Sequence, residues 1–363
     1  MHNVGSTCLQ LPRVSVLVLN YNGLRWLPKC FSAVSVTDYP DLDLYLVDNG
    51  STDGSVDYVR RSFPSVKIMR NEQNLGFAEG YNRAIRKINS EYVVLLNNDT
   101  RVLNSKWVQC LVDKASADTK IAAVTCKMVS LEDLSRLDSV GGIGIPFWRG
   151  FVDMGRNESD QGQYDHASFE PFAFCGGAAL LKRDIFARLG GFDAKFFLYM
   201  EDVDLSWRLR LLGYRVAFAP KAVVAHYFSG SFKTKDIDAQ KLYYCHRNIL
   251  RTILKNCGSS LGWALRNYLL FTLMMAGGYS LLEPSKAIAA VKAILWNMTN
   301  LKDTCVHRSR IQVSRNTSEA EILDKMYPNL RRYQPAERPK LRRILNVLFE
   351  YSQRNCLRKF GHI

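Results

Sequence analysis

Two acidic sites, far apart along the chain, have the residue types and surroundings needed for chemistry. In "YVVLLNNDT" an apolar run leads directly into two amides, Asp99 and a hydroxyl, and in "YMEDVD" a group of carboxylates opens a helical pattern. A carboxylate at the end of a buried strand is suited to a cation that carries phosphates. A carboxylate such as Asp202, kept ionised at a helix N-terminus, is suited to act as a general base on a hydroxyl.

Each of these side chains also has a structural interpretation. Asn and Asp favour turns, so "NNDT" is equally typical of a plain turn. The helix dipole favours carboxylates in a first turn, and Asp204 can in addition pair with Arg208 four residues on. At the same spacing Asp202 meets only the uncharged Ser206, so the functional hypothesis is stronger for Asp202.

His226 closes the apolar run "AVVAH" after Pro220. A single histidine in this setting is typical of a structural residue whose hydrogen bonds are satisfied. Its neutral imidazole is also a cation ligand, and both interpretations stay open.

The elements that must position these residues alternate β-rich runs with helical patterns. The expected strands are 14–20, 43–47, 66–70, 92–96 and 121–124, and the expected helices are 24–36, 54–62, 76–88 and 105–117. This alternation predicts βαβ units in an α/β fold, Rossmann-like, with a mostly parallel central sheet and flanking helices. In such sheets ligands bind outside the carboxyl ends of the strands.

Polar side chains follow four of the expected strands at this edge. They are Asn20, Tyr21 and Asn22; Asp48 and Asn49; Asn71; and Asn97, Asn98 and Asp99. Turn chemistry explains any one of these clusters, but four on one edge favour a ligand site.

Neither of the common phosphate-binding loops is present. The turn after the first strand reads "NYNGLRW", which lacks G-x-G-x-x-G, and no G-x-x-x-x-G-K-[ST] occurs in the sequence. Phosphates bound at this edge would therefore need a metal. Mg²⁺ or Mn²⁺ typically lies between one or two carboxylates and a diphosphate.

Residues 125–175 are less regular. "MGRNESDQGQYDH" is typical of an exposed loop that covers a site, and "GGIG" at 141–144 of a flexible loop. The run "FAFCGGAALL" (172–181) predicts an apolar strand interrupted by Gly176 and Gly177. Glycines inside a strand mark either a bulge or the close approach of a ligand.

Seven segments in order resemble the inverting GT-A glycosyltransferases of family 2, in their rhamnosyltransferase-like branch. They are "VSVLVLNYNG", "LVDNGSTDGS", "NEQNLGFAEGYNRAI", "VVLLNNDT", "CGGAALLKRDIFARLGGFD", "FFLYMEDVDLSWRLRLLGYRVAFAP" and "VVAHYFSGSF". Each is weak alone, but together, at normal spacing over roughly 13–255, they are specific.

The resemblance implies a role for each matching residue. The turn Asn20–Asn22, with Tyr21, and Asp48 would hold the base and ribose of a nucleotide-sugar, while Asn49 and Asn98 lie at the same strand ends. Asn74, Gly76 and Asn82 would line the donor pocket, and Gly176 and Gly177 would let the donor sugar approach the backbone. Asp99 would bind Mg²⁺ or Mn²⁺, with His226 as a further ligand. Asp202 would be the catalytic base, and Glu201 and Asp204 would support it or the acceptor.

One departure from the family pattern concerns the metal. Asn97 stands where some relatives have a first aspartate, so ligation by the single carboxylate of Asp99 is implied.

The resemblance also implies the reaction. A hydroxyl of a saccharide or lipid-linked saccharide would lose its proton to Asp202 and attack the anomeric carbon, with inversion. The donor expected from this branch is dTDP-rhamnose, with UDP-hexoses as the alternative.

The charge of the chain is concentrated near its C-terminus. Residues 230–363 hold 23 of the 49 Lys and Arg but only 9 of the 34 Asp and Glu. A helix is expected at 235–255, and 268–282 is a 15-residue apolar run, shorter than the roughly 20 residues of a spanning helix. The amphipathic stretch 285–298, with Ile288, Val291, Leu295 and Met298 on one side, is typical of a membrane interface.

We therefore expect an anionic membrane surface as a partner and a cytoplasmic location on the inner face of the cell membrane. Arg342, Arg343, Arg358 and Lys359 add to the basic charge. The alternative is a soluble helical appendage that covers the edge of the catalytic domain. The absence of an apolar run before Val14 predicts no secretory signal, and nine scattered cysteines without a C-x-x-C pair argue against a zinc ribbon.

The expected organisation is an N-terminal tail at 1–12, a GT-A catalytic domain at 13–232 and a helical basic region at 233–363. Two other functions are compatible with parts of the pattern. A nucleotidyltransferase on a similar scaffold would carry a glycine-rich basic loop after its first strand, for which "NYNGLRW" is a poor match. A non-catalytic polyanion-binding protein would use the basic tail, which contains no recognisable nucleic-acid-binding motif, so no nucleic acid is expected as a partner.

Overall fold

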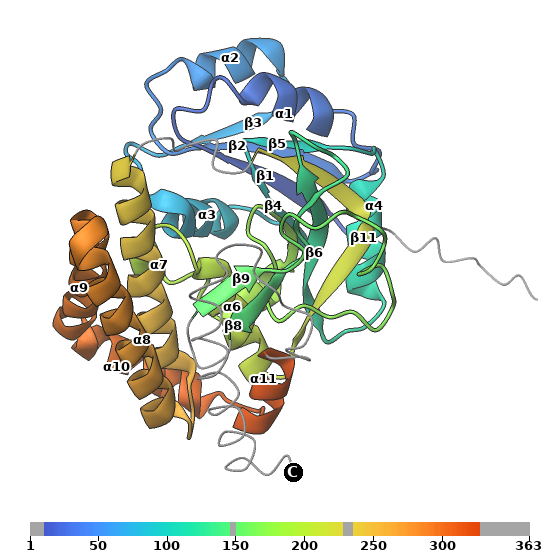
Figure 1. Ribbon diagram of the computed structural model, residues 1–363. Helices are drawn as coiled ribbons and strands as arrows, with labels where there is room; N and C mark the ends of the chain where they lie inside the picture. Colours follow the sequence, from blue (N-terminus) through green and yellow to red (C-terminus); the bar gives the residue numbers. More distant parts are fainter. Residues whose placement is uncertain (1–10, 146–149, 228–234, 327–363) are drawn as a thin grey trace, which may run out of the picture.

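The computed structural model describes residues 11–145, 150–227 and 235–326 and shows an α/β architecture (Figure 1). A nine-stranded sheet follows the order β3-β2-β1-β4-β10-β6-β11-β5, with β7 beside β6, and β8 pairs with β9 in a separate ribbon. The strands are β1 Val14–Asn20, β2 Leu42–Asp48, β3 Lys67–Arg70, β4 Tyr92–Asn97, β5 Thr100–Val102, β6 Ile121–Ser130, β7 Leu137–Ser139, β8 Gly142–Ile145, β9 Gly150–Asp153, β10 Ala178–Lys182 and β11 Arg215–His226.

Helices cover both faces of the sheet and extend beyond it (Figure 1). They are α1 Leu27–Val34, α2 Ser55–Ser62, α3 Gly76–Arg86, α4 Trp107–Ser116, α5 Arg183–Arg188, the short 3₁₀ turn η2 Ala194–Phe196, α6 Glu201–Leu211, α7 Lys235–Asn256, α8 Leu261–Leu282, α9 Pro284–Thr299, α10 Leu301–Val313 and α11 Glu319–Met326.

The predicted α/β class with a mostly parallel sheet is confirmed, and one strand reverses direction in the middle of it. Strands β3, β2, β1 and β4 are parallel neighbours, as are β6 and β11. Strand β10 runs antiparallel between β4 and β6, with Ala178 opposite Leu96. Because of this reversal, the start of β10 lies at the edge where β4 ends, and the turn before β10 joins the ligand edge.

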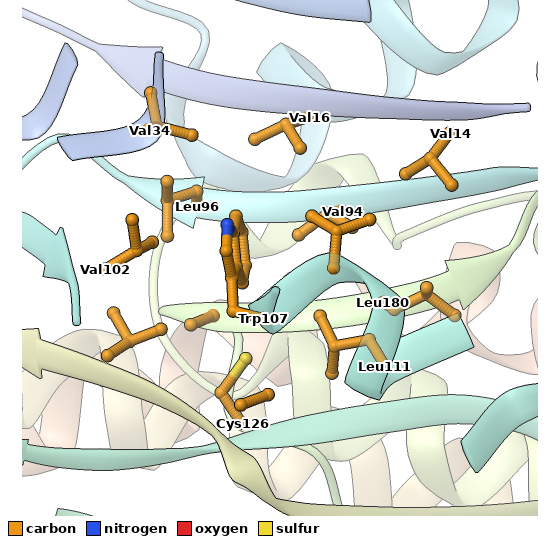
Figure 2. Packing of buried hydrophobic residues seen from close by; sticks show 14 of the residues in the cluster. Val14, Val16, Val34, Val94, Leu96, Val102, Trp107, Leu111, Cys126 and Leu180 are labelled. Carbon is orange, nitrogen blue, oxygen red and sulfur yellow. The ribbon is translucent and has the colours of Figure 1, made fainter. Parts of the chain in front are cut away.

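The two faces of the central strands pack into separate cores. Val16 and Val94 lie with Trp107 in the core beneath α1 and α4 (Figure 2), whereas Leu17 and Leu95 face the core of α3 and α6. Burial on both faces explains why these strands are apolar runs rather than alternating patterns. This packing fixes the strand ends that carry the polar residues.

Two sequence expectations for 125–181 are wrong. The glycine-rich run 141–144 was expected to be a loop, but Gly142–Ile145 forms β8, paired with β9. The strand expected at 172–181 begins only at Ala178, and Gly176 and Gly177 form the turn before it. The glycines therefore lie at the end of a strand, beside the polar edge of the sheet.

The helices α7 to α10 stack beside the central sheet (Figure 1), with α7 between the sheet and the other three. Within the described ranges, no helix is both long and apolar enough to cross a bilayer. The expected basic pairs at 342–343 and 358–359, and most of the expected N-terminal tail, lie outside the described residues.

Candidate active site

The ends of β1, β2 and β4 form one hydrogen-bonded cluster of amides and carboxylates. Asn20 Nδ2 donates to Asp48 Oδ1 at 3.2 Å, and Asn98 Nδ2 donates to Asn20 Oδ1 at 2.7 Å. Asp48 is fully buried and also accepts the backbone N–H of Ser51. The structure thus brings together three of the four predicted strand ends in one polar cluster.

The turn after β1 and the loop after β2 continue this cluster. Asn22, in the left-handed region at φ 48, accepts the N–H of Thr52 through Oδ1, and Tyr21 is half exposed. Asn49 Nδ2 donates to Gly76 O at 2.9 Å, and Asn74 Oδ1 accepts the N–H of Gly76. The fourth strand end joins too, since Asn71 Nδ2 donates to Asn49 Oδ1 at 2.9 Å.

Asn82 lies apart from this cluster of strand-end residues. Its amide exchanges two hydrogen bonds of 2.9 Å with the backbone of Phe192, and it also donates to Glu79. In this structure Asn82 therefore holds the segment before η2 rather than facing the strand ends.

A second group forms around Asp99, between β4 and β5. His226 Nε2 lies 3.4 Å from Asp99 Oδ1, and its Nδ1 lies 2.7 Å from Asp138 Oδ2. Burial disfavours the imidazolium, but hydrogen bonds and charge from the two carboxylates outweigh it and raise the pKa of His226 to about 9. Arg156 lies 3.7 Å from Asp138 and also pairs with Asp153, so the group extends toward the cavity described next.

This second group has the chemistry of a small cation site. Asp99 offers a carboxylate and His226 an imidazole, and a histidine that binds a metal usually donates its other N–H to a carboxylate, as Nδ1 would to Asp138. Within 11–145, 150–227 and 235–326, no cluster of three or more such side chains could hold a metal alone. A cation here would need further ligands from a bound molecule, and it would displace the proton of His226.

A cavity of about 200 Å³ lies between the start of α6, the Gly176–Gly177 turn and β9. Asn97, Asp153, Gly176 and Asp202 are among its lining residues. Asn97 N donates to Gly177 O at 2.9 Å, so the turn that carries Asp99 and the wall that carries Asp202 are joined directly. Asp202 lines this cavity directly, whereas Asp99 is not among its lining residues and follows the lining residue Asn97 by two positions.

Asp202 is held in a fixed direction within this cavity. Its Oδ2 accepts the backbone N–H of Gly176 at 2.9 Å, and its Oδ1 accepts that of Val203 at 2.8 Å. Burial raises the pKa of Asp202 to about 6, against the two N–H donors, and the charge of Asp153 adds to the rise. A carboxylate with this pKa is ionised at neutral pH and is a better proton acceptor than an ordinary aspartate.

The neighbouring acids have different settings. Burial, with the charge of Asp202, raises the pKa of Glu201 well above its usual range, and its Oε2 has no hydrogen-bond partner among the described residues. Asp204 points away, into a buried ion pair with Arg208 at 2.8 Å, as predicted from the i, i+4 spacing, and also contacts Lys255. Glu201 therefore lines the cavity, while Asp204 belongs to the packing of α6.

The sequence interpretation missed Asp138 and Asp153. Both lie in the irregular segment 125–175, where no periodicity marks them, and Asp138 pairs with a histidine 88 residues away. Asp153 closes the short apolar run "GFV", which is a weak local signal, whereas Asp138 follows only Arg136 and Leu137 and has none.

Comparisons with known proteins identify the family of this part of the chain. The family model described as "Glycosyl transferase family 2" matches residues 15–190, which include the strand ends, Asp99 and the glycine turn. Residues 15–190 belong to glycosyltransferase family 2. As a family 2 glycosyltransferase the protein transfers a sugar, as the sequence predicted.

Similar proteins include enzymes of cell-envelope polysaccharide synthesis. The "N-acetylglucosaminyl-diphospho-decaprenol L-rhamnosyltransferase" of Mycobacterium tuberculosis is 27% identical over 241 residues, covering 58% of this chain and 75% of that protein. The "O-antigen biosynthesis protein RfbC" of Myxococcus xanthus is 27% identical over 207 residues, covering 55% of this chain and 16% of that protein. These matches support the rhamnosyltransferase-like branch of the family.

Solved structures share the fold of this glycosyltransferase. GalNAc-T7 with UDP, GalNAc and Mn²⁺ superposes with a TM-score of 0.55 at 15% identity, covering 80% of this chain and 58% of that chain. TarS of S. aureus, residues 1–349 with UDP-GlcNAc, superposes with a TM-score of 0.53 at 15% identity, covering 86% of this chain and 89% of that chain.

Proposed function

We propose that this family 2 glycosyltransferase acts by a single displacement with inversion, and that Asp202 is its catalytic base. The observation that carries the proposal is the partly buried, directed carboxylate of Asp202 in a cavity that Asn97, at the end of β4, also lines. The acceptor hydroxyl gives its proton to Asp202, and its oxygen forms the new bond to the anomeric carbon. The bond from that carbon to the diphosphate oxygen breaks, and the nucleoside diphosphate leaves with the electron pair.

The donor is a nucleotide-sugar, with dTDP-rhamnose as the first candidate and a UDP-hexose as the second. The candidate sugar reflects the relative from M. tuberculosis, which is named as an L-rhamnosyltransferase for N-acetylglucosaminyl-diphospho-decaprenol. The same name supports a saccharide or lipid-linked saccharide as acceptor. Asn20, Asp48 and the loop at Gly76 are the proposed contacts to the nucleotide.

Asp202→Asn tests the base. The variant keeps the size of the side chain and one of its two accepted N–H bonds but loses the proton acceptor, so turnover should fall by about 10²–10⁴-fold. Binding of UDP and dTDP, measured by calorimetry, should stay within about twofold of wild type, since both lack the sugar. Wild-type turnover in a folded Asp202→Asn protein refutes the assignment.

Asp99 and His226 would hold Mg²⁺ or Mn²⁺, with the donor diphosphate completing the ligand set. The cation would supply charge neutralisation at the leaving diphosphate. Asp138 orients the imidazole of His226, and Asp99 presents its carboxylate from the β4 end.

The metal proposal is tested by binding rather than turnover. In calorimetry, Mn²⁺ should strengthen the binding of UDP or dTDP to wild type but not to Asp99→Asn. Asp160→Asn, which removes a carboxylate that pairs with Lys127 instead, is the control. Equal nucleotide affinity with and without Mn²⁺ in the wild type would exclude this role.

We also propose that the enzyme works on the inner face of the cell membrane, through the outer faces of α8 and α9. The packed faces of these helices carry small or polar residues, among them Ala276 and Ala293, while large apolar residues point outward, such as Leu273 at 55% and Met298 at 65% exposure. Residues 261–302 contain four basic residues and one acidic residue, Glu283. Apolar stripes with a cationic border fit an anionic bilayer surface.

Vesicle sedimentation tests this surface. Wild type should bind phosphatidylglycerol vesicles and not pure phosphatidylcholine, and the double variant Leu273→Ser with Met298→Ser should lose most of that binding. Val36→Ser, at a residue 67% exposed on the catalytic domain, should change nothing. Undiminished binding by the double variant, or self-association that it abolishes, would refute the membrane assignment.

A further inference from the structure

The segment that leads into the base helix has an unusual backbone. Phe197, Tyr199 and Met200 have φ values of 62, 69 and 68, in the left-handed region that side chains other than glycine rarely adopt. Met200 directly precedes Glu201 and Asp202 at the start of α6. Such a conformation persists only where surrounding contacts impose it.

Two neighbouring side chains of α7 contact this segment: Arg247 donates to Lys195 O and Phe196 O, and Asn248 reaches further along it. Asn248 is fully buried, and its Nδ2 donates to three carbonyls of this segment: Phe196 O at 3.0 Å, Leu198 O at 2.9 Å and Tyr199 O at 2.7 Å. Its Oδ1 accepts from Arg247 Nε at 2.8 Å, which fixes the direction in which the amide faces. The two N–H groups of this amide are thus shared among three carbonyls, of which Phe196 O also accepts from Arg247 and from the N–H of Leu198.

The same segment contacts the start of α3 and lines the cavity. Phe77 N, at the start of α3, donates to Phe197 O at 2.6 Å, and Leu198, Tyr199 and Met200 line the cavity with Asp202. A displacement of residues 196–200 would therefore move α6, which carries Asp202, relative to the rest of the cavity wall.

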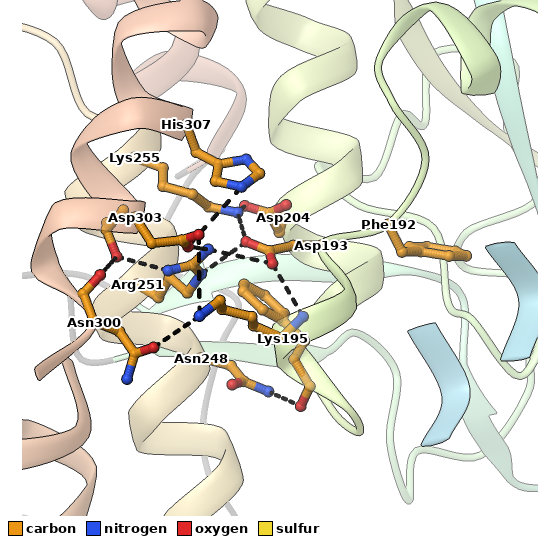
Figure 3. A network of polar contacts seen from close by, with 12 residues as sticks. Phe192, Asp193, Lys195, Asp204, Asn248, Arg251, Lys255, Asn300, Asp303 and His307 are labelled. Atoms are coloured by element: carbon orange, nitrogen blue, oxygen red, sulfur yellow. Dashed lines mark hydrogen bonds and ion pairs between the residues drawn. The ribbon is translucent and has the colours of Figure 1, made fainter. Parts of the chain in front are cut away.

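The amide of Asn248 is held rigidly in turn. Arg247 lies between the rings of Tyr244 and Trp296, 4.7 and 4.6 Å from their centres, and Nδ2 of Asn297 on α9 donates to its carbonyl at 2.9 Å. Further along the same face of α7, Arg251 and Lys255 pair with Asp193, which lies just before η2 (Figure 3). Both ends of the segment are thus tied to α7 by buried polar contacts.

We propose that Asn248 is a positioning residue for the transfer reaction: it holds residues 196–200 in the conformation that aims Asp202 into the cavity. The inference rests on the proposed role of Asp202 as base. Through Asn248, helix α7 would then contribute to the rate of sugar transfer. Residues 196–200 lead into α6, and the amide that donates hydrogen bonds to them lies on α7. The position of Asp202 therefore depends on both α6 and α7.

The test uses the full chain and a matched control. Asn248→Leu keeps the volume of the side chain and removes the three donated bonds, whereas Gln312→Leu removes an amide that donates to Lys255 O and Asn256 O at the far end of α7. Initial rates of nucleoside diphosphate release are measured with dTDP-rhamnose, UDP-glucose and UDP-N-acetylglucosamine. For Asn248→Leu we expect kcat to fall about 10–100-fold, with the donor KM within about twofold, because misplacement of a catalytic group acts on the rate. Gln312→Leu should leave both constants unchanged.

A rescue variant separates positioning from general loss of structure. Glycine adopts positive φ without steric cost, so Met200→Gly added to Asn248→Leu should recover part of the lost kcat. Should Asn248→Leu give no folded protein, Asn248→Ser, which keeps one donor, should show an intermediate loss of kcat.

The outcomes are distinct for the two proposals. Wild-type kcat in folded Asn248→Leu or Asn248→Ser, or an equal loss in Gln312→Leu, overturns the positioning role. If Asp202→Asn, assayed in parallel, keeps its turnover, the proposed base itself is wrong. If Asp202→Asn is inactive while Asn248→Leu is fully active, only the positioning role fails.

Discussion

The pH dependence of turnover should report the burial of Asp202. The base must be ionised to accept the hydroxyl proton, so kcat/KM should fall as the pH drops through the pKa of this group. Burial places that pKa at about 6, whereas an exposed aspartate titrates near 3.8. The sign follows directly, because lower pH protonates the base and removes it from the reaction.

The size of the fall in kcat/KM distinguishes a raised pKa of Asp202 from that of an ordinary aspartate. With a pKa of about 6, roughly one Asp202 in ten is ionised at pH 5, so kcat/KM should be about tenfold below its plateau. With an ordinary aspartate pKa, more than about nine in ten would be ionised at the same pH, and the loss would be barely measurable. The assay is the initial rate of nucleoside diphosphate release between pH 4.5 and 8, roughly the range over which such a group titrates.

A neighbouring variant checks that the titrating group is Asp202. The charge of Asp153 contributes to the raised pKa, so Asp153→Asn should move the acid limb to lower pH. Asp160→Asn, in the same irregular segment but paired with Lys127, should leave the limb in place. A profile flat down to pH 5, or a limb that Asp153→Asn moves to higher pH, would refute the reasoning.

Two further predictions concern the framework around the site. Lys255→Met removes a cation that contacts the buried carboxylates of Asp193 and Asp204, so it should lower the free energy of unfolding by about 3–5 kcal/mol. The control Lys302→Met, at an exposed residue, should lower it by less than about 0.5 kcal/mol. Both values are measured by urea denaturation. Gly76→Ala should cost more than about 2 kcal/mol, since its Cβ would lie 2.3 Å from Phe197 O, whereas Gly54→Ala, with φ 83 and open space around it, should cost about 1 kcal/mol. Equal losses within either pair would contradict the packing described.

The sequence predicts the parts of this site that depend on local pattern. The strand ends at Asn20, Asp48 and Asp99 follow apolar runs, and the structure gathers them at one edge because parallel strands end together. The pair of Asp204 with Arg208 also follows from helical spacing alone.

The remaining features depend on contacts between distant segments. The reversal of β10 brings Gly176 to the ligand edge, and no residue within the strand indicates that reversal. Asp138 and Asp153 carry no periodic signal, and their partners are set by tertiary packing. The role of Asn248 is hidden for the same reason: a buried amide on α7 is identified only by the three carbonyls that face it.

The anomeric configuration of the first product tests the central claim most directly. A single displacement by a hydroxyl that has lost its proton to Asp202 breaks the donor bond on the opposite face of the sugar. Proton NMR of the early product should therefore show a linkage of opposite anomeric configuration to the donor. A product of retained configuration, or a mixture formed by the enzyme from the outset, would contradict the account.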